Sequence, residues 1–442
     1  MRVIGKISAF TRRVRMRARR RLGVVFALGV PALMAACFLV WWGTQLWGLP
    51  DLGDPLDLEA SGTIDIPADR DAFVEYRHAS SMLGRPWPKL AWTKTGEADP
   101  DEEWSRADPA WRGHVEANRD ALSAWLRGTG RPEAIYHQPR DMTPDTELPV
   151  VEDIQGLARL ASLEGTRLQE AGDLDGAWAW YLGILQSSRH VGRHGCMIER
   201  SIGVRLHELA CRRLSTWAAD PRVEAGLLRE ALDGVIAADA LTPPASDGVK
   251  VEYRLFLRVL AEHGDKLDRS LDTVYSDPNG DLSGYWRHWA VPNTARSTAR
   301  ELALLLKQER ERSLRVARLL AANWLAQVDK PSRLRARMAH HDPLIFESGP
   351  GDPPSSRALS PEALAGWYQS SFIARRWIGD RSRWLASLDA ERARQARLVV
   401  LLASELHRRE RGEMPASPEE LVGPYLESLP EGFDAPEDAP IH

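Results

Sequence analysis

The chain has 442 residues, 43% of them hydrophobic and 27% charged, which is enough apolar content for two or three domains and argues against disorder of the whole chain. Its net charge of −4 combines nine basic and no acidic residues in positions 1–50 with about −13 on the rest, so the body does not favour nucleic acid as a partner. Alanine, leucine and arginine dominate and β-branched residues are sparse. This composition predicts an all-α fold.

An apolar segment near the N-terminus predicts a single transmembrane helix. Residues 22–43 carry no charge, and a helix of this length spans about 33 Å against a hydrocarbon core of about 30 Å. Seven arginines in positions 12–21 precede the segment, and Asp51, Asp54 and Asp57 follow it. The positive-inside bias therefore places residues 1–21 in the cytoplasm and the body on the outer side of the cell inner membrane.

A lipoprotein signal is the alternative interpretation of the same segment. Residues 33–37, Leu-Met-Ala-Ala-Cys, resemble a bacterial lipobox, in which Cys37 is lipidated and becomes the new N-terminus. Apolar residues continue through positions 38–42, where a lipoprotein signal usually becomes polar, and the segment is longer than the apolar core of a cleaved signal. An uncleaved helix is therefore the expectation, with lipidation or ordinary cleavage as the alternatives.

The rest of the chain divides by composition. Proline, aspartate and glycine in residues 44–66 predict a linker between membrane and body. Residues 67–149 mix short helical patterns with loops and tryptophans, which either pin the loops to a helical core or form a carbohydrate-stacking surface. Residues 150–348 predict a helical array or bundle, residues 349–361 a Pro/Gly linker, and residues 362–442 C-terminal helices with a capping tail.

Apolar periodicity within the helical regions predicts individual helices. Ser417 followed by Pro418 and two glutamates predicts a capping box that starts a further short helix near the C-terminus. The longer predicted helices cover residues 197–218, 222–238, 249–263, 294–327, 360–378 and 381–409.

One stretch between residues 157 and 187 resembles a tetratricopeptide-type hairpin. Gly165 lies on the first helix, Gly172 and Asp173 make the turn, and Tyr181 lies on the second helix. No second copy occurs at the expected interval, whereas stacked repeats need about three neighbours. The resemblance therefore implies one helical hairpin and not a peptide-binding solenoid.

The C-terminal segment resembles a motif that follows the long helix of type II secretion pseudopilins and that ends exported single-pass helical proteins of planctomycete-type bacteria. The match covers about 30 residues, with Met414 in place of a tyrosine and Gly432-Phe433-Asp434 in place of an Asp-Pro-Phe turn. Residues 189–214 also resemble the middle of those exported proteins, and neither resemblance supplies an activity. A pseudopilin role is disfavoured because the predicted membrane span lies nearly 370 residues before the tail. The matching residues are Arg411-Gly412, Met414-Pro415, Leu421-Val422, Pro424-Tyr425-Leu426 and Leu429-Pro430.

One dense polar cluster is the candidate functional site. On a continuous helix, His190 and His194 would share a face as zinc ligands do, with Cys196 or Glu199 as a third donor. Gly192 and Gly195 interrupt such a helix, and the glutamate expected between the histidines of a zinc peptidase is absent, so the sequence favours a structural role. The cluster consists of Arg189, His190, Arg193, His194, Cys196, Glu199, Arg200 and His207.

Two further groups of residues bear on metal binding and disulfide formation. His340-His341-Asp342 fits a helix C-terminus better than a metal site. Cys196 and Cys211 would lie about 22 Å apart on one helix, too far for a disulfide, so we expect two buried thiols.

The sequence contains no glycine-rich phosphate loop, nucleophile elbow or paired-cysteine zinc pattern. It therefore predicts no cofactor and a non-enzymatic interaction or scaffold module of the cell envelope, with the membrane and other envelope proteins as partners. The alternative is an extracytoplasmic hydrolase that uses His190, His194 and Glu199, either with or without a bound metal ion.

Overall fold

The computed structural model describes residues 48–84, 103–261, 307–335, 343–378 and 381–433, with residues 338–339 and a few single positions between 29 and 46. These residues are mostly α-helical, which confirms the all-α prediction. Within them, one short antiparallel hairpin pairs β1 (Met338–Ala339) with β2 (Ile345–Phe346).

The predicted membrane segment 22–43 lies, apart from a few single positions, outside the described residues. None of the helices within the described residues combines the length and apolar character needed to cross a bilayer.

The first half of the body is a layered group of helices, several of which have clear local signals. The side chain of Asp71 caps the first of them by accepting a hydrogen bond from the Phe73 amide, and Pro109 occupies the first turn of the next. Trp111 and Trp125 are buried in the core and Trp104 packs against it, so these tryptophans pin the region to the core. The helices are α2 (Ala72–Met82), α3 (Pro109–Ala117), α4 (Arg119–Thr129), α5 (Pro149–Ala171) and α6 (Leu174–His190).

The pair α5–α6 confirms the predicted hairpin. Gly172 ends α5 in the left-handed conformation at φ 88°, and the Asp173 side chain caps α6 by accepting the Gly176 amide hydrogen at 2.9 Å. A Cβ atom at Gly165 would overlap the ring of Tyr181, so the tetratricopeptide-like glycine and tyrosine form a close inter-helix contact. Apolar residues of both helices belong to the first hydrophobic core.

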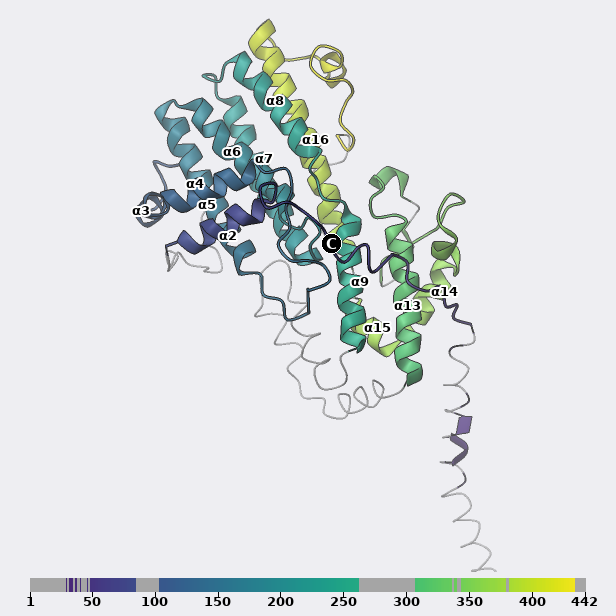
Figure 1. The fold of residues 1–442 in the computed structure, drawn as a ribbon. Helices are drawn as coiled ribbons and strands as arrows, with labels where there is room; N and C mark the ends of the chain where they lie inside the picture. Colours follow the sequence, from purple (N-terminus) through teal and green to yellow (C-terminus); the bar gives the residue numbers. More distant parts are fainter. Residues whose placement is uncertain are drawn as a thin grey trace, which may run out of the picture.

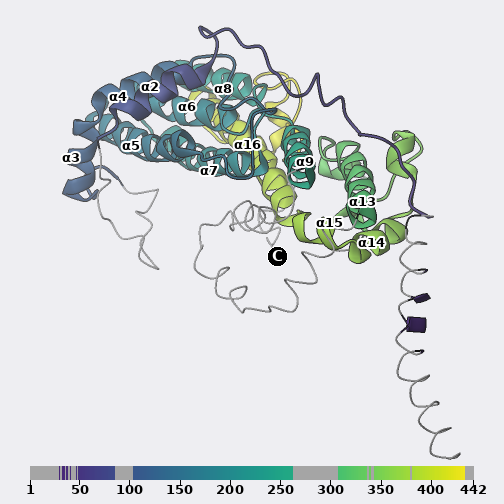
Figure 2. The ribbon, with the colours of Figure 1, turned by 60° about the horizontal axis from the view of Figure 1, so that its bottom comes forward.

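Four helices form a ring in the centre of the molecule (Figure 1). Helix α6 contacts both α7 and α8, and α16 contacts the same two helices from the other side. Helices α4 and α5 cover α6 on its outer face, as Figure 2 shows from a second direction. The new members of the ring are α7 (Met197–Ala219), α8 (Ala225–Asp239) and α16 (Ser382–Arg411).

A second hydrophobic core lies beside this ring. Leu385 and Leu388 at the start of α16 belong to the second core, whereas the apolar residues from Leu398 to Leu406 of the same helix belong to the first. Helix α16 therefore joins the two cores. The second core takes residues from β2, α9 (Ala245–Ala261), α13 (Lys307–Leu325), α14 (Pro361–Ser370), α15 (Phe372–Trp377) and the start of α16. Two short 3₁₀ turns, η1 (Ser332–Leu334) and η2 (Pro354–Arg357), lie between α13 and α14 in the chain.

The predicted linker 44–66 is not a free spacer over its described residues. Leu49 is 3% exposed and belongs to the second core. Asp51 and Asp54 pair with Arg318 of α13 at 2.9 Å and 3.0 Å. The segment runs across the helices of the second core before it enters α2, as both ribbon views show. A Pro/Asp/Gly composition disfavours a helix but carries no signal of whether the side chains pack on the body.

The C-terminal tail returns along α16. Leu421 and Leu426 are buried in the first core. Gly432 lies against the backbone of Ala393, which is about five helical turns before the end of α16 at Arg411. The predicted capping box is wrong: the Ser417 side chain makes no cap, and the segment forms only a 3₁₀ turn, η3 (Pro418–Leu421). The chain must turn at once there, because Leu421 points into the core.

Candidate functional site

The polar cluster begins where α6 ends. Val191 caps α6, Gly192 adopts φ 86° and His194 adopts φ 55°, so the chain turns sharply before α7 begins at Met197. Gly192 lies so close to the Arg200 backbone that a Cβ atom would overlap it. The hypothesis that His190 and His194 share one helical face is therefore wrong, because the helix stops between them.

The two histidines contact different helices. The Nδ1 atom of His190 lies 2.7 Å from the Tyr76 hydroxyl of α2, and burial lowers the pKa of His190 to about 4, so this imidazole is neutral. The Nδ1 atom of His194 lies 3.3 Å from the Asp247 carboxylate of α9. Each ring thus already has a protein partner, and the two rings do not face a common point.

Glu199 and Cys196 form the N-terminal cap of α7. The Glu199 carboxylate accepts the Cys196 amide hydrogen at 2.8 Å, in a reciprocal capping box with the cysteine side chain. Burial raises the pKa of Glu199 to about 7. Across the described residues, no group of three or more His, Cys, Asp or Glu side chains has an arrangement that could hold a metal ion.

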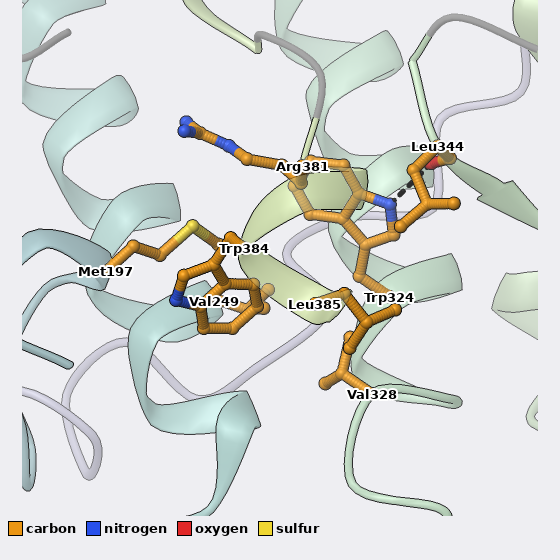
Figure 3. Close-up of a pocket in the computed structure, with 8 residues that line it drawn as sticks. All are labelled: Met197, Val249, Trp324, Val328, Leu344, Arg381, Trp384 and Leu385. Carbon is orange, nitrogen blue, oxygen red and sulfur yellow. Dashed lines mark hydrogen bonds between the residues drawn. The ribbon is translucent and has the colours of Figure 1, made fainter. Parts of the chain in front are cut away.

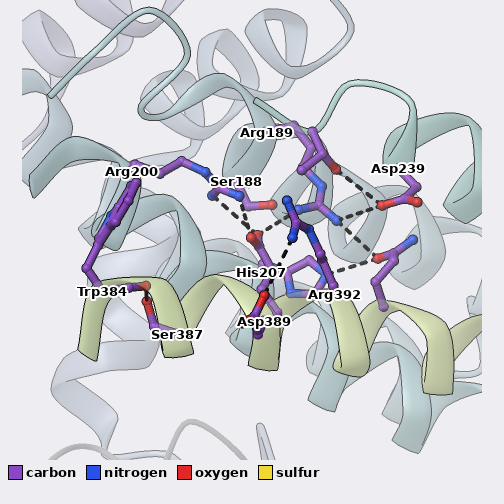
Figure 4. Close-up of polar contacts among 12 residues, drawn as sticks. Ser188, Arg189, Arg200, His207, Asp239, Trp384, Ser387, Asp389 and Arg392 are labelled. Atoms are coloured by element: carbon purple, nitrogen blue, oxygen red, sulfur yellow. Dashed lines mark hydrogen bonds and ion pairs between the residues drawn. The ribbon is translucent and has the colours of Figure 1, made fainter. Parts of the chain in front are cut away.

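Two arginines of the cluster share one buried carboxylate that comes from α16 (Figure 4). Arg189 Nη1 lies 2.6 Å from Glu391 Oε1, and Arg200 donates to both oxygens of the same carboxylate. All three side chains are at most 2% exposed. Burial acts to raise the pKa of Glu391, but the two guanidinium groups outweigh it and lower the pKa to about 2.

Gln395, one turn further along α16, extends this arrangement. Its Oε1 atom accepts from Arg189 at 3.2 Å and lies 2.9 Å from His207 Nε2, while its Nε2 atom donates to the Val235 carbonyl of α8 at 3.1 Å. Burial lowers the pKa of His207 to about 3, so the ring is neutral and its Nε2–H donates. We call Arg189, Arg200, His207, Glu391 and Gln395 the buried polar network.

The buried polar network joins all four helices of the central ring. Its members are 0–3% exposed, so water and substrates have no direct access to them. Burying such charges costs desolvation energy that ion pairing offsets only when the geometry is good, and a role in fixing helix register is well attested for buried polar groups. The network lies between the two hydrophobic cores on α16, where it can fix that helix against α6 and α7.

A small cavity lies near the network, between α7, α9, α13 and α16 (Figure 3). Its free volume is about 10 Å³, far less than the roughly 300–1,000 Å³ of typical ligand sites. Its lining residues are Met197, Val249, Trp324, Val328, Leu344, Arg381, Trp384 and Leu385.

The other predicted residues are separate from the network. Arg193 pairs with Glu133 at 3.1 Å near the surface. Cys196 and Cys211 are free and buried, as expected, and Cys37 is free and exposed. The residues from His340 to Asp342 lie outside the described residues.

Sequence reasoning missed the partners that explain the cluster. Glu391 and Gln395 lie about 200 positions away from Arg189 along the chain, and Tyr76 lies more than 100 positions before His190. An isolated Glu and Gln four apart on an amphipathic helix carry no local signal of burial. Only the apolar residues on both sides of them, at Leu388 and Ala396, place them on the buried face.

Comparison with known proteins gives no relative: no family model, no curated protein and no solved structure matches the chain.

Proposed function

We propose that this protein is a membrane-anchored, extracytoplasmic helical protein that acts as a non-enzymatic interaction or scaffold module of the cell envelope. The apolar segment 22–43, its arginine-rich flank and the resemblance to exported helical proteins support the anchor and its direction. One observation carries the non-enzymatic part of the proposal: the side chains of the buried polar network are 0–3% exposed, so a substrate cannot reach them.

The geometry of the cluster disfavours the hydrolase alternative. A hydrolase would need His190, His194 and Glu199 to converge on one bound water or metal ion. These side chains instead contact Tyr76, Asp247 and the amide of Cys196, on three sides of the turn. His190, His194 and Glu199 therefore make contacts within the protein and do not converge on one point.

Metal analysis of the purified full-length chain tests the enzyme alternative. We expect the wild type and the variants His190→Ala and His194→Ala to carry the same substoichiometric zinc after dialysis. One zinc ion per chain that both substitutions remove would restore the metal-dependent hydrolase.

Crosslinking in intact membranes tests the interaction role. Val74 on α2 and Ile236 on α8 are large apolar side chains that are 41% and 45% exposed, so a photo-reactive residue at either position samples an apolar surface. We expect a discrete crosslinked product with a protein at one position or both. The exposed Glu116 of α3 serves as the control position. Equal, diffuse products at all three positions would contradict the proposal.

A further inference from the structure

We propose that the body is held close to the bilayer with α14 and the adjoining part of α13 toward the membrane, and that residues 48–62 set this orientation. We call residues 48–62 the strap. The inference rests on the proposed membrane anchor at residues 22–43. It goes further because it names the face of the body that meets the lipid headgroups.

The first residues of the strap are fixed to the second core. Leu49 is 3% exposed, and its carbonyl accepts a hydrogen bond from Arg315 of α13 at 3.1 Å. Gly48 lies against the indole ring of Trp367 on α14, at a distance where an added Cβ would be 3.2 Å from the ring. The chain thus reaches the body at the junction of α13 and α14.

The strap stays attached beyond this point. Arg318 holds both Asp51 and Asp54, and the Tyr253 hydroxyl of α9 donates to Asp54 at 2.5 Å. Further along, Arg254 of α9 donates to Ser61 at 3.3 Å. These contacts join the strap to two helices of the second core, so the point of attachment cannot move without breaking several of them.

Chain length then limits the distance between body and membrane. Five residue steps separate Gly43, the end of the apolar segment, from Gly48, and a fully extended chain covers at most about 18 Å in five steps. The headgroup layer alone takes roughly 5–8 Å of this distance on each side of the bilayer. Helix α14, which touches Gly48, therefore lies next to the headgroups.

Two glycines offer matched positions for a probe. Gly366 on α14 and Gly113 on α3 are both exposed, both helical and both free of neighbours within 4 Å of an added Cβ. In both ribbon views α3 lies at the end of the body opposite α14 (Figures 1 and 2). A body of about 370 residues has a radius of gyration of ~21 Å, so these two ends differ clearly in distance from the bilayer.

Headgroup quenching measures the orientation directly. The full chain carries Cys37→Ser together with either Gly366→Cys or Gly113→Cys, each labelled with bimane, in phosphatidylcholine vesicles that contain a headgroup-nitroxide phosphatidylcholine. The native Cys196 and Cys211 are buried. We expect quenching at position 366 to be several-fold stronger than at position 113. Equal quenching, or stronger quenching at 113, would overturn the inference.

A charge-matched pair of double variants tests the strap. Asp51→Ala with Asp54→Ala removes both ion pairs to Arg318, whereas Asp65→Ala with Asp69→Ala removes two exposed carboxylates of the same region. We expect the first variant to bring the quenching at 366 toward that at 113, and the second to leave it unchanged. An unchanged ratio in the folded first variant would show that the strap does not set the orientation. If that variant does not fold, the comparison of 366 with 113 decides.

Alkaline extraction of the same vesicles separates the two proposals. A chain that leaves the membrane at high pH would refute the anchor, and with it the proposed function. A chain that stays in the membrane but shows equal quenching at both positions would refute only the orientation.

Discussion

Glu391 is the residue on which the buried polar network depends. Its carboxylate pairs with two guanidinium groups that are at most 2% exposed, and the half-exposed Asp239 also pairs with Arg189 at 3.4 Å. In a buried ion pair, the loss of one partner is costly because the other charge stays buried without compensation.

The substitution Glu391→Gln should therefore lower the free energy of unfolding by about 3–5 kcal/mol, the range seen when one partner of a buried pair is removed. Urea unfolding monitored by circular dichroism measures the change. Glu410→Gln on the same helix is the control, since Glu410 pairs with the half-exposed Arg229 and such surface pairs contribute little to stability. Similar losses in both variants would show that the network does not carry the charge balance described.

His207 gives the network a pH dependence of known sign. Its folded-state pKa of about 3 lies below the unfolded value of 6.5, so between these values the unfolded chain binds a proton that the folded chain does not. His207 therefore lowers stability as the pH falls below 6.5. Glu199, with a folded pKa of about 7, acts in the opposite sense between pH 4.5 and 7.

Comparison with His207→Gln isolates the histidine. From proton linkage, the stability of the wild type relative to the variant should fall by roughly 1–2 kcal/mol between pH 6.5 and pH 5. Urea titrations at the two pH values measure it. A difference that does not change with pH would mean that His207 is protonated in the folded protein.

At the scale of elements, helix α16 does two jobs along its 30 residues. Its beginning packs in the second core, its end packs in the first, and the buried polar network occupies the boundary between them. A polar layer between two apolar surfaces specifies one register, because a shift of the helix would separate Glu391 from its arginines.

The α5–α6 hairpin offers a test of packing at a glycine. Gly165→Ala would place a Cβ atom into the ring of Tyr181 and should destabilise the protein by about 1–3 kcal/mol, as overpacking does. Gly366→Ala is the control: this exposed glycine has no neighbours, and alanine should stabilise its helix by up to about 1 kcal/mol. Thermal unfolding of the two variants should shift in opposite directions. An equal shift in the same direction would contradict the close packing at Gly165.

Helices and their ends were largely predictable, because periodicity and caps are local. The predicted helix 197–218 agrees with α7, and the predicted helix 381–409 agrees with α16. The predicted helix 360–378 divides at Ser371, whose side chain caps α15. Serine is common both inside and before helices, so the sequence alone did not mark this break.

The candidate site was only partly predictable. Gly192 and Gly195 correctly indicated an interruption of the helix, since glycine is needed where φ is positive or the backbone approaches closely. The carboxylate partner could not be inferred, because many acidic residues lie on predicted helices and only tertiary packing selects Glu391. The packing of the strap on the second core could not be inferred either, because only tertiary packing selects Arg318 as the partner of Asp51 and Asp54.

At the scale of the molecule, two hydrophobic cores share one long helix, and the strap connects the second core to the proposed anchor. Arg189 and Arg200, which first suggested chemistry, instead join α6 and α7 to α16 through Glu391.

The mass of the protease-protected, membrane-bound fragment tests the central claim most directly. Cells with an opened outer envelope are treated with protease, and the fragment that stays in the membrane is analysed by mass spectrometry. The account predicts an unacylated fragment that retains residues 1–36 and ends shortly after the apolar segment. A fully protected chain would place the body in the cytoplasm, and a fragment beginning at a lipidated Cys37 would replace the membrane helix with acyl chains.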